Sequence, residues 1–187
     1  MRLDVIFDTT CPWCFLGKHR LEEALRQKPN ISPDITWHAF LVNPNLPPEG
    51  VDRKDYLNVK FGDETRSNRI YQSIYEAGKS LGIEFQFDLI QRMPNSFDSH
   101  RLVRFAGRKS RASEALEALF QAYFIRGIDI GNRTALYDLA KEMGFAADDM
   151  RNYFYSDEDV ESIKEQNAYV HGLGINGVPA FVIDGQF

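Results

Sequence analysis

The chain has 187 residues, of which 43% are hydrophobic and 13% aromatic, and its formal net charge at pH 7 is −5. This composition supports a sizeable core and excludes a disordered protein. The acidic balance provides no overall positive field, so neither nucleic acid nor an anionic membrane is expected as a partner. The apolar runs are too short to span a bilayer, and Asp4 and Asp8 stand where a secretory signal would be apolar, so a cytoplasmic location is expected.

A strand, a turn and a helix are predicted at the start of the chain. The apolar run at residues 3–7 predicts a buried strand, and the polar residues 8–10 end it. From Pro12 onward, apolar residues recur at helical spacing until Pro29, and one of the two preceding threonines is expected to cap this helix. Cys11 is therefore placed at a helix N-terminus.

A second strand is predicted at residues 35–42, which are rich in β-branched and aromatic residues. No convincing strand follows until residue 180, so we predict an all-helical insertion at residues 51–155. The insertion would interrupt a discontinuous domain made of residues 1–50 and 156–187. Amphipathic helical segments are predicted at residues 52–61, 64–82, 96–109, 112–127, 133–143, 147–155 and 158–173.

The last predicted strand covers residues 180–183. Asp184-Gly185 follows it and predicts a type I′ hairpin turn, with Gln186-Phe187 as the start of the return strand. The chain is thus expected to stop within the hairpin between its third and fourth main strands. We expect the parent protein to continue with a strand and a closing helix.

Cys11 and Cys14, the two cysteines of the chain, enclose Pro and Trp. A helix N-terminus favours thiolate over thiol, so Cys11 is the expected nucleophile. Cys14 lies one turn further along and is expected to be the shielded, resolving thiol. Pro12 suits the first helical turn, and Trp13 is expected at the exposed rim, where an aromatic ring can contact a partner.

Two other interpretations of the cysteine pair stay open. A zinc site needs two more ligands, but there is no further cysteine and the four histidines form no closely spaced pair, so no metal is expected. The two cysteines could also be small buried hydrophobic residues. Their placement around Pro-Trp at a strand-to-helix junction favours redox chemistry.

Several motifs spread along the chain carry a resemblance to a known family. They are residues 8–14 (DTTCPWC), 40–44 (FLVNP), 95–102 (NSFDSHRL), 127–130 (GIDI) and 174–181 (GINGVPAF). Together they cover essentially the whole chain and resemble the thioredoxin-fold superfamily, in particular its DsbA-like branch and the cytosolic FrnE-like group. The resemblance implies an α/β thioredoxin fold with the helical insertion after the second strand.

The resemblance also implies supporting site residues. In that superfamily the proline that enters the third strand is cis and lies against the active-site disulfide, and Pro179 holds the matching position. By spacing alone Pro179 would be an ordinary trans proline at a strand start. In the cis form it would leave the Val178 backbone free to pair with an extended client beside Cys11. Asn95 and His100 belong to one of the motifs, and His100 is a candidate proton relay facing the cysteine cleft.

The chain departs from the family pattern in two ways. DsbA proper carries His inside its CxxC sequence and lives in the periplasm, whereas this chain has Trp13 and no export signal. Strong oxidase behaviour therefore does not carry over, and the redox potential and the direction of exchange stay open. The closing strand and helix, which help to bind glutathione in related enzymes, are also absent.

The expected activity is thiol–disulfide exchange, as a reductase, isomerase or oxidase of protein disulfides. Its expected partners are proteins with thiols or disulfides; no cofactor is required, and glutathione is an optional redox partner. One alternative is a glutathione-dependent isomerase or transferase of the 2-hydroxychromene-2-carboxylate or kappa type, which usually presents Ser as nucleophile. Another is a non-enzymatic, redox-sensing binding module.

The remaining conspicuous side chains are assigned to structure rather than to the site. Asp8 and His38 are expected to serve local hydrogen bonding or the core. Four arginines at helical spacing predict a solvated helix face: Arg101, Arg104, Arg108 and Arg111. Several aromatic residues are expected in the core: Tyr71, Tyr75, Phe120, Tyr123 and Phe124.

Overall fold

The structure is a computed structural model that describes residues 1–186. Its main sheet has three strands in the order β2-β1-β5. The central strand β1 (Arg2–Phe7) pairs in parallel with β2 (Asp34–Ala39) and antiparallel with β5 (Ala180–Ile183). The first two strands and the last one therefore come from opposite ends of the chain and form one sheet, as the thioredoxin fold requires.

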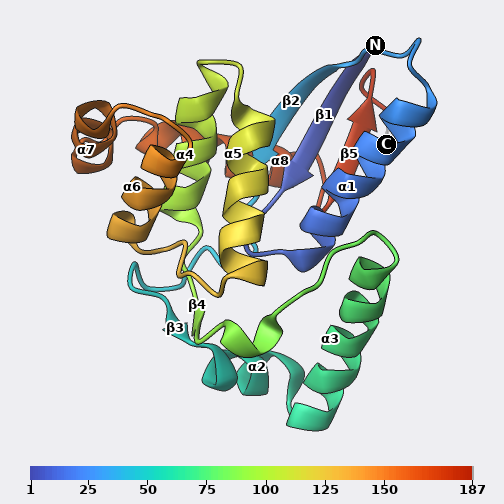
Figure 1. Ribbon diagram of the computed structural model, residues 1–187, viewed down its shortest axis with the longest axis vertical. Coiled ribbons are helices and arrows are strands. Elements are labelled where there is room, and N and C mark those ends of the chain that lie inside the picture. Colours follow the sequence, from blue (N-terminus) through green and yellow to red (C-terminus); the bar gives the residue numbers. More distant parts are fainter. Residues whose placement is uncertain (187) are drawn as a thin grey trace.

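The helices cover and extend this sheet. Figure 1 shows α4, α5, α6 and α7 gathered beside it, whereas α2 and α3 lie below the N-terminal end of α1. In chain order they are α1 (Pro12–Gln27), α2 (Arg53–Phe61), α3 (Glu64–Lys79), α4 (Phe97–Gly107), α5 (Ala112–Phe120), α6 (Arg133–Glu142), α7 (Ala147–Tyr155) and α8 (Val160–Gly172).

The expected fold is confirmed, with differences at the ends of its strands. The second strand was predicted to reach residue 42, but β2 ends at Ala39. The backbone N–H groups of Leu41 and Val42 donate to the side chains of Asn167 and Asp8 instead of to a neighbouring strand. The hairpin is present, since φ is positive at Asp184 and Gly185. Ile183 pairs with Gln186, whereas the last residue of the predicted return strand, Phe187, lies outside the described residues.

The insertion at residues 51–155 is helical but not all-helical. Val51–Asp52 (β3) pairs with Arg92–Met93 (β4) in an antiparallel ladder too short to be recognised from sequence. The segment predicted at residues 112–127 is α5 followed by a π-helical turn at Gln121–Ile125. The predicted boundaries of the insertion stay a prediction.

Aromatic side chains join the inner face of α1 to the insertion. Phe15 is fully buried and stacks on Phe120, with ring centroids 5.0 Å apart, and on Phe124 at 6.0 Å. Phe85 packs edge-on against Phe15 at 5.8 Å. Burial of rings of this size contributes strongly to stability, so the insertion and the sheet share one core.

The prediction of a solvated arginine face is wrong for Arg101, its first residue. Arg101 is fully buried and donates hydrogen bonds to the backbone oxygens of Tyr153, Ser156 and Glu158. It also donates to the Asp98 carboxylate. A buried guanidinium needs such partners, so Arg101 anchors the segment between α7 and α8 to α4.

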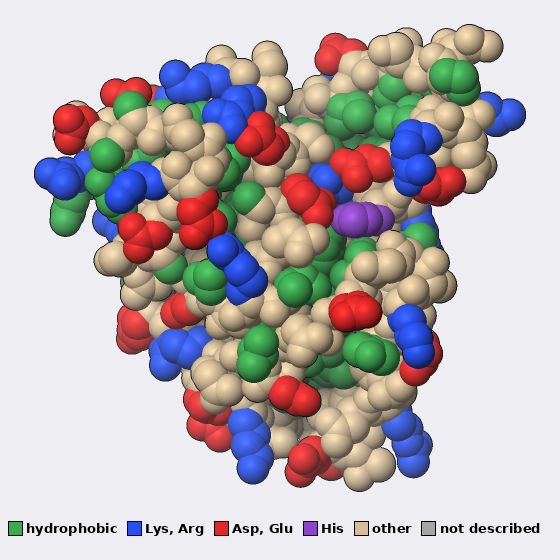
Figure 2. Space-filling model, in the orientation of Figure 1, with side chains coloured by type: hydrophobic (Ala, Val, Ile, Leu, Met, Phe, Trp, Pro, Cys, Tyr) green, Lys and Arg blue, Asp and Glu red, His purple; other side chains and the backbone are tan. Residues whose placement is uncertain are grey.

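The molecular surface carries charges of both signs. Figure 2 shows acidic and basic side chains interspersed over the visible face. Among the helices within residues 1–186, none is both long and apolar enough to cross a membrane.

Candidate functional site

The turn between β1 and α1 places Cys11 at the first position before the helix. Cys11 is the N-cap residue, with an extended backbone, and Pro12 opens the first turn. The expected threonine cap is not formed: Thr10 donates its hydroxyl to Asp8, and the Thr9 hydroxyl bonds to Ser99. The sulfur of Cys11 is left to interact with the free N–H groups of the helix.

The two thiols are unequal. Cys11 is half-buried and Cys14 is 2% exposed, and neither forms a disulfide. A hydrogen bond from the Cys14 thiol, helped by the backbone N–H groups of Cys14 and Trp13, lowers the pKa of Cys11 despite its burial. Burial and the neighbouring Cys11 sulfur raise the pKa of Cys14 well above its usual value. Cys11 is therefore the more readily ionised and the more accessible of the two.

A cis peptide bond between Val178 and Pro179 faces the cysteines, as the resemblance implied. The Val178 carbonyl oxygen lies 3.6 Å from the Cys11 sulfur and accepts its thiol hydrogen. Pro179 packs against Gly17 of α1, where an added Cβ would lie 2.9 Å from the proline ring. Because residue 17 is a glycine, the loop before β5 can approach α1 closely.

The redox turn is the segment at residues 8–11 between β1 and α1, and Asp8 is its buried carboxylate. Its Oδ1 accepts hydrogen bonds from the Thr10 N–H and hydroxyl, and its Oδ2 accepts from the Val42 N–H at 2.7 Å and from the Ser96 hydroxyl at 3.2 Å. Burial opposes its charge, but the nearby His100 imidazole and these donors hold its pKa below the usual value. The sequence analysis predicted local hydrogen bonding or a place in the core for Asp8. Its carboxylate in fact joins three segments that are distant in the sequence.

Neither His100 nor Asn95 lines the cavity at Cys11. His100 is 1% exposed, its Nε2 lies 3.7 Å from Asp8 Oδ1, and its ring packs at 4.9 Å from that of Phe7. Asn95 accepts a hydrogen bond from the Phe97 N–H and donates one to the Leu46 oxygen. Asn95 therefore shapes the entry to α4, whereas His100 lies against Asp8 and Phe7 and does not reach the cavity. Their predicted functional roles stay predictions.

A cavity of about 240 Å³ opens directly on Cys11 and Trp13. Trp13 is 41% exposed at its rim, as predicted, and its contact with a partner stays a prediction. The opposite wall comes from α2 and α3 of the insertion, with side chains that the sequence analysis did not assign to the site. They are Tyr56, Lys60, Phe61, Ile70, Tyr71 and Ile74.

The amphipathic pattern of α2 and α3 was the available signal for this wall. It shows that each helix has an apolar side, but it does not show that part of this side faces the redox turn instead of the core. Tyr71 is half-buried there, and burial raises the pKa of its hydroxyl, so it stays protonated at neutral pH. Within residues 1–186 no group of three or more acidic, histidine or cysteine side chains is arranged to hold a metal.

Comparison with known proteins gives relatives over the full length of the chain. Residues 2–187 match the DSBA-like thioredoxin domain family. The Bacillus subtilis protein YwbO, described as uncharacterized, is 28% identical over 98% of this chain and 86% of its own length.

Solved structures share the fold at low sequence identity. A probable DsbA oxidoreductase, SCO1869 from Streptomyces coelicolor, has a TM-score of 0.91 and 23% identity, over 100% of this chain and 82% of its own. A 2-hydroxychromene-2-carboxylate isomerase has a TM-score of 0.76 and 15% identity, over 100% and 87% of the two chains. The cytosolic disulfide reductase DsbM from Pseudomonas aeruginosa has a TM-score of 0.72 and 18% identity over the same shares, and it is also known with GSH bound.

These structural likenesses show the fold alone, whereas the family match covers nearly every residue. It agrees with the parallel and antiparallel pairing of the sheet, the cysteine pair at the start of α1 and the cis proline before β5. The chain belongs to the DsbA-like thioredoxin domain family.

Proposed function

We propose that the protein catalyses thiol–disulfide exchange, with Cys11 as nucleophile and Cys14 as resolving thiol. The observation that carries the proposal is the contrast between the two sulfurs: one is half-buried, beside a cavity and lowered in pKa, and the other is buried and raised in pKa. A nucleophile needs access and thiolate character, whereas a resolving thiol needs protection from outside reagents.

The exchange has two steps. The Cys11 thiolate attacks one sulfur of a client disulfide, so that a mixed disulfide forms and the other client sulfur leaves as a thiolate, which takes up a proton. Cys14 then loses its proton and attacks Cys11, so that the client leaves as a dithiol and Cys11 and Cys14 form a disulfide. Run in reverse, the same steps oxidise a client.

The direction of exchange follows the surroundings. A cytoplasmic location is part of this proposal and is supported by the likeness to the cytosolic reductase DsbM. In a cytosol poised at roughly −220 to −320 mV, a pair with a higher potential would rest reduced and act as a reductase or isomerase. Protein clients with disulfides, and glutathione as a redox partner that is not a resident cofactor, are the proposed reactants.

Cys11→Ser and Cys14→Ala test the mechanism together. Cys11→Ser should abolish exchange with every disulfide, because no thiolate then faces the cavity. Cys14→Ala should form a mixed disulfide that persists on Cys11, visible by non-reducing electrophoresis and mass spectrometry. Appreciable turnover by Cys11→Ser, or no adduct on Cys14→Ala, would contradict the proposal.

The same trap separates the alternatives. The small cavity and the likeness to 2-hydroxychromene-2-carboxylate isomerase favour small-molecule, glutathione-dependent chemistry as a second candidate. Protein adducts on Cys14→Ala from a cell extract would support the protein-disulfide activity, whereas glutathione adducts alone would favour the second candidate. A redox-dependent change in partner affinity without turnover would indicate a binding module.

A further inference from the structure

One ammonium group lines the same cavity as Cys11 and has no acidic partner among the described residues. Among the described residues that line the cavity at Cys11, Lys60 is the single lysine or arginine, and none is Asp or Glu. No carboxylate within residues 1–186 forms an ion pair with Lys60, whose charge is therefore free to act on a molecule in the cavity. The cavity thus has a positive charge that the fold itself does not neutralise.

Hydrogen bonds hold this charge at the cavity wall. Lys60 Nζ donates to the Tyr56 hydroxyl at 2.6 Å, and that hydroxyl donates to Asn43 Oδ1 at 2.8 Å. Lys60 Nζ also lies 5.1 Å from the centroid of the Tyr56 ring. The remaining protons of Lys60 and the Asn43 amide NH₂, which has no partner among the described residues, are donors available to a bound molecule.

These donors fit an anion that enters together with a disulfide. Carboxylates accept charge-assisted hydrogen bonds from ammonium groups, and because Lys60 is exposed at the cavity wall, a molecule that enters the cavity from solvent can reach it. The net charge of −5 repels anionic molecules in general, so an isolated cation at the cavity acts selectively on groups that reach it.

We propose that Lys60, assisted by Asn43, selects disulfides that carry a carboxylate close to the reacting sulfur and binds that carboxylate while Cys11 attacks. The inference rests on the proposed exchange activity and names its substrate class. Oxidised glutathione and a client with Asp or Glu next to its cysteine both supply this chemistry.

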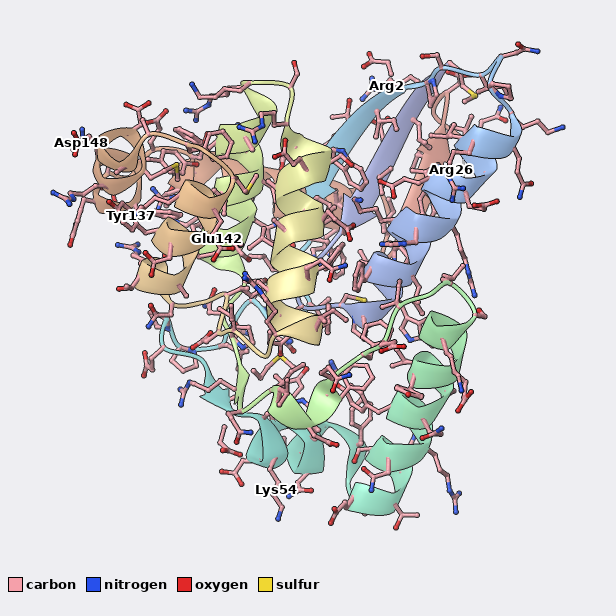
Figure 3. All side chains as sticks on the ribbon, viewed as in Figure 1. Arg2, Arg26, Lys54, Tyr137, Glu142 and Asp148 are labelled. Atoms are coloured by element: carbon pink, nitrogen blue, oxygen red, sulfur yellow. The ribbon has the colours of Figure 1, made fainter. Side chains whose placement is uncertain are left out.

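The test compares charged and neutral disulfides on the reduced protein. Lys60→Gln should lower the second-order rate constant for oxidised glutathione by about fivefold to tenfold and reduce its dependence on ionic strength. The rate constant for the uncharged bis(2-hydroxyethyl) disulfide should stay within about twofold, because Lys60 then has no charge to contact. Lys54→Gln is the matched control and should change neither rate, because Lys54 lies on the same helix, is not among the residues that line the cavity and points away from α1 in Figure 3.

A pair of disulfide peptides, identical except for Asp or Asn beside the cysteine, distinguishes the two sources of the carboxylate. A preference for the Asp peptide that Lys60→Gln removes would assign the site to acidic clients. An effect on oxidised glutathione alone would assign the site to glutathione. Both results support the proposal.

Three results would overturn it. An equal fall with charged and neutral disulfides would mean that Lys60 acts on Cys11 itself. Unchanged rates in Lys60→Gln would mean that it contacts no substrate carboxylate. If the wild-type protein reacts with none of these disulfides, the proposed function fails, and the substrate assignment fails with it.

Discussion

Two of the junctions between the insertion and the rest of the molecule have opposite character. At the Asp8 junction, the buried carboxylate accepts hydrogen bonds from uncharged groups of Thr10, Val42 and Ser96. At the Lys18 junction on the flank of α1, Lys18 Nζ bonds to Glu22 at 2.6 Å and to Glu117 of α5 at 2.8 Å.

The difference lies in how each charge is satisfied. Asp8 is fully buried, so only groups that the fold holds beside it, these donors and the nearby His100 imidazole, can stabilise it. Lys18 is 4% exposed, but its partner Glu117 is 30% exposed and still reaches water. We infer that the junction under the redox turn is rigid and intolerant of change, whereas the flank is an adjustable contact.

Replacement of Asp8 should give the largest effect. Asp8→Ala leaves the N–H groups of Thr10 and Val42 buried without acceptors, and we expect a loss of about 3–5 kcal/mol in the free energy of unfolding. Urea denaturation measures it. A loss below about 1 kcal/mol would contradict the rigid junction, because even one stranded donor costs that much.

Asp8→Asn is the control of matched size. It removes the charge while keeping one oxygen for the donors, so it should cost less stability than Asp8→Ala. Because the Asp8 carboxylate raises the pKa of both thiols, Asp8→Asn should also lower the pKa of Cys11. The ultraviolet absorbance of the thiolate against pH measures this, and an unchanged pKa would show that Asp8 has only a structural role.

Lys18→Met should have an intermediate effect. The variant keeps the buried hydrocarbon stem but removes the cation from Glu117, which water can partly compensate. We expect a loss of about 2 kcal/mol, less than for a fully buried ion pair. A double-mutant cycle with Glu117→Gln isolates the pair, and a coupling energy near zero would show that the ion pair contributes nothing.

Glu117→Gln should change the pH dependence of stability. Burial opposes ionisation of Glu117, but hydrogen bonds from His19, Gln121 and Lys18 lower its pKa to about 2 from an ordinary 4.5. A lowered folded-state pKa stabilises the protein above about pH 4.5, and this contribution disappears as the pH falls towards 2. After solvent screening we expect about 1 kcal/mol at neutral pH, shrinking on acidification, as the difference between variant and wild type in urea denaturation.

Ser99→Ala should give the smallest effect at the Asp8 junction. The Ser99 hydroxyl bonds to the Thr9 hydroxyl at 2.6 Å and donates to the Ser96 oxygen at 2.7 Å. The substitution leaves the buried Thr9 hydroxyl without this partner, and one stranded neutral hydroxyl should cost about 1 kcal/mol in thermal unfolding. A loss as large as that of Asp8→Ala would mean that the hydroxyls, rather than the carboxylate, hold the junction.

The redox turn could be predicted from sequence because its determinants are local. An apolar strand, a polar turn and Pro12 after Cys11 place a thiol at a helix N-terminus without any distant contact. The cis form of Pro179 needed the family resemblance, since spacing alone favours trans. The strands of the main sheet could also be predicted from sequence, because they are short apolar runs at both ends of the chain.

The cavity wall and the Asp8 junction could not be predicted because their parts are distant in sequence. Asp8 accepts hydrogen bonds from the Val42 N–H and the Ser96 hydroxyl, and no periodic pattern connects these positions. Helical spacing grouped Arg101 with arginines that stay partly or fully exposed, although the chain between α7 and α8 covers it. From sequence alone Lys60 cannot be told from an ordinary surface lysine, because only the position of α2 in the fold brings it to the cavity at Cys11.

The short pairing of β3 with β4 has an evolutionary consequence. It joins the two ends of the segment that carries α2 and α3, and so ties this segment off at its base. One side of the cavity is therefore encoded separately from the strand, turn and helix that hold the thiols. Length changes or substitutions between Asp52 and Arg92 can alter this wall and leave the strand, turn and helix that hold the thiols intact, so members of the family can diverge on one side of the cavity while they keep the cysteine pair.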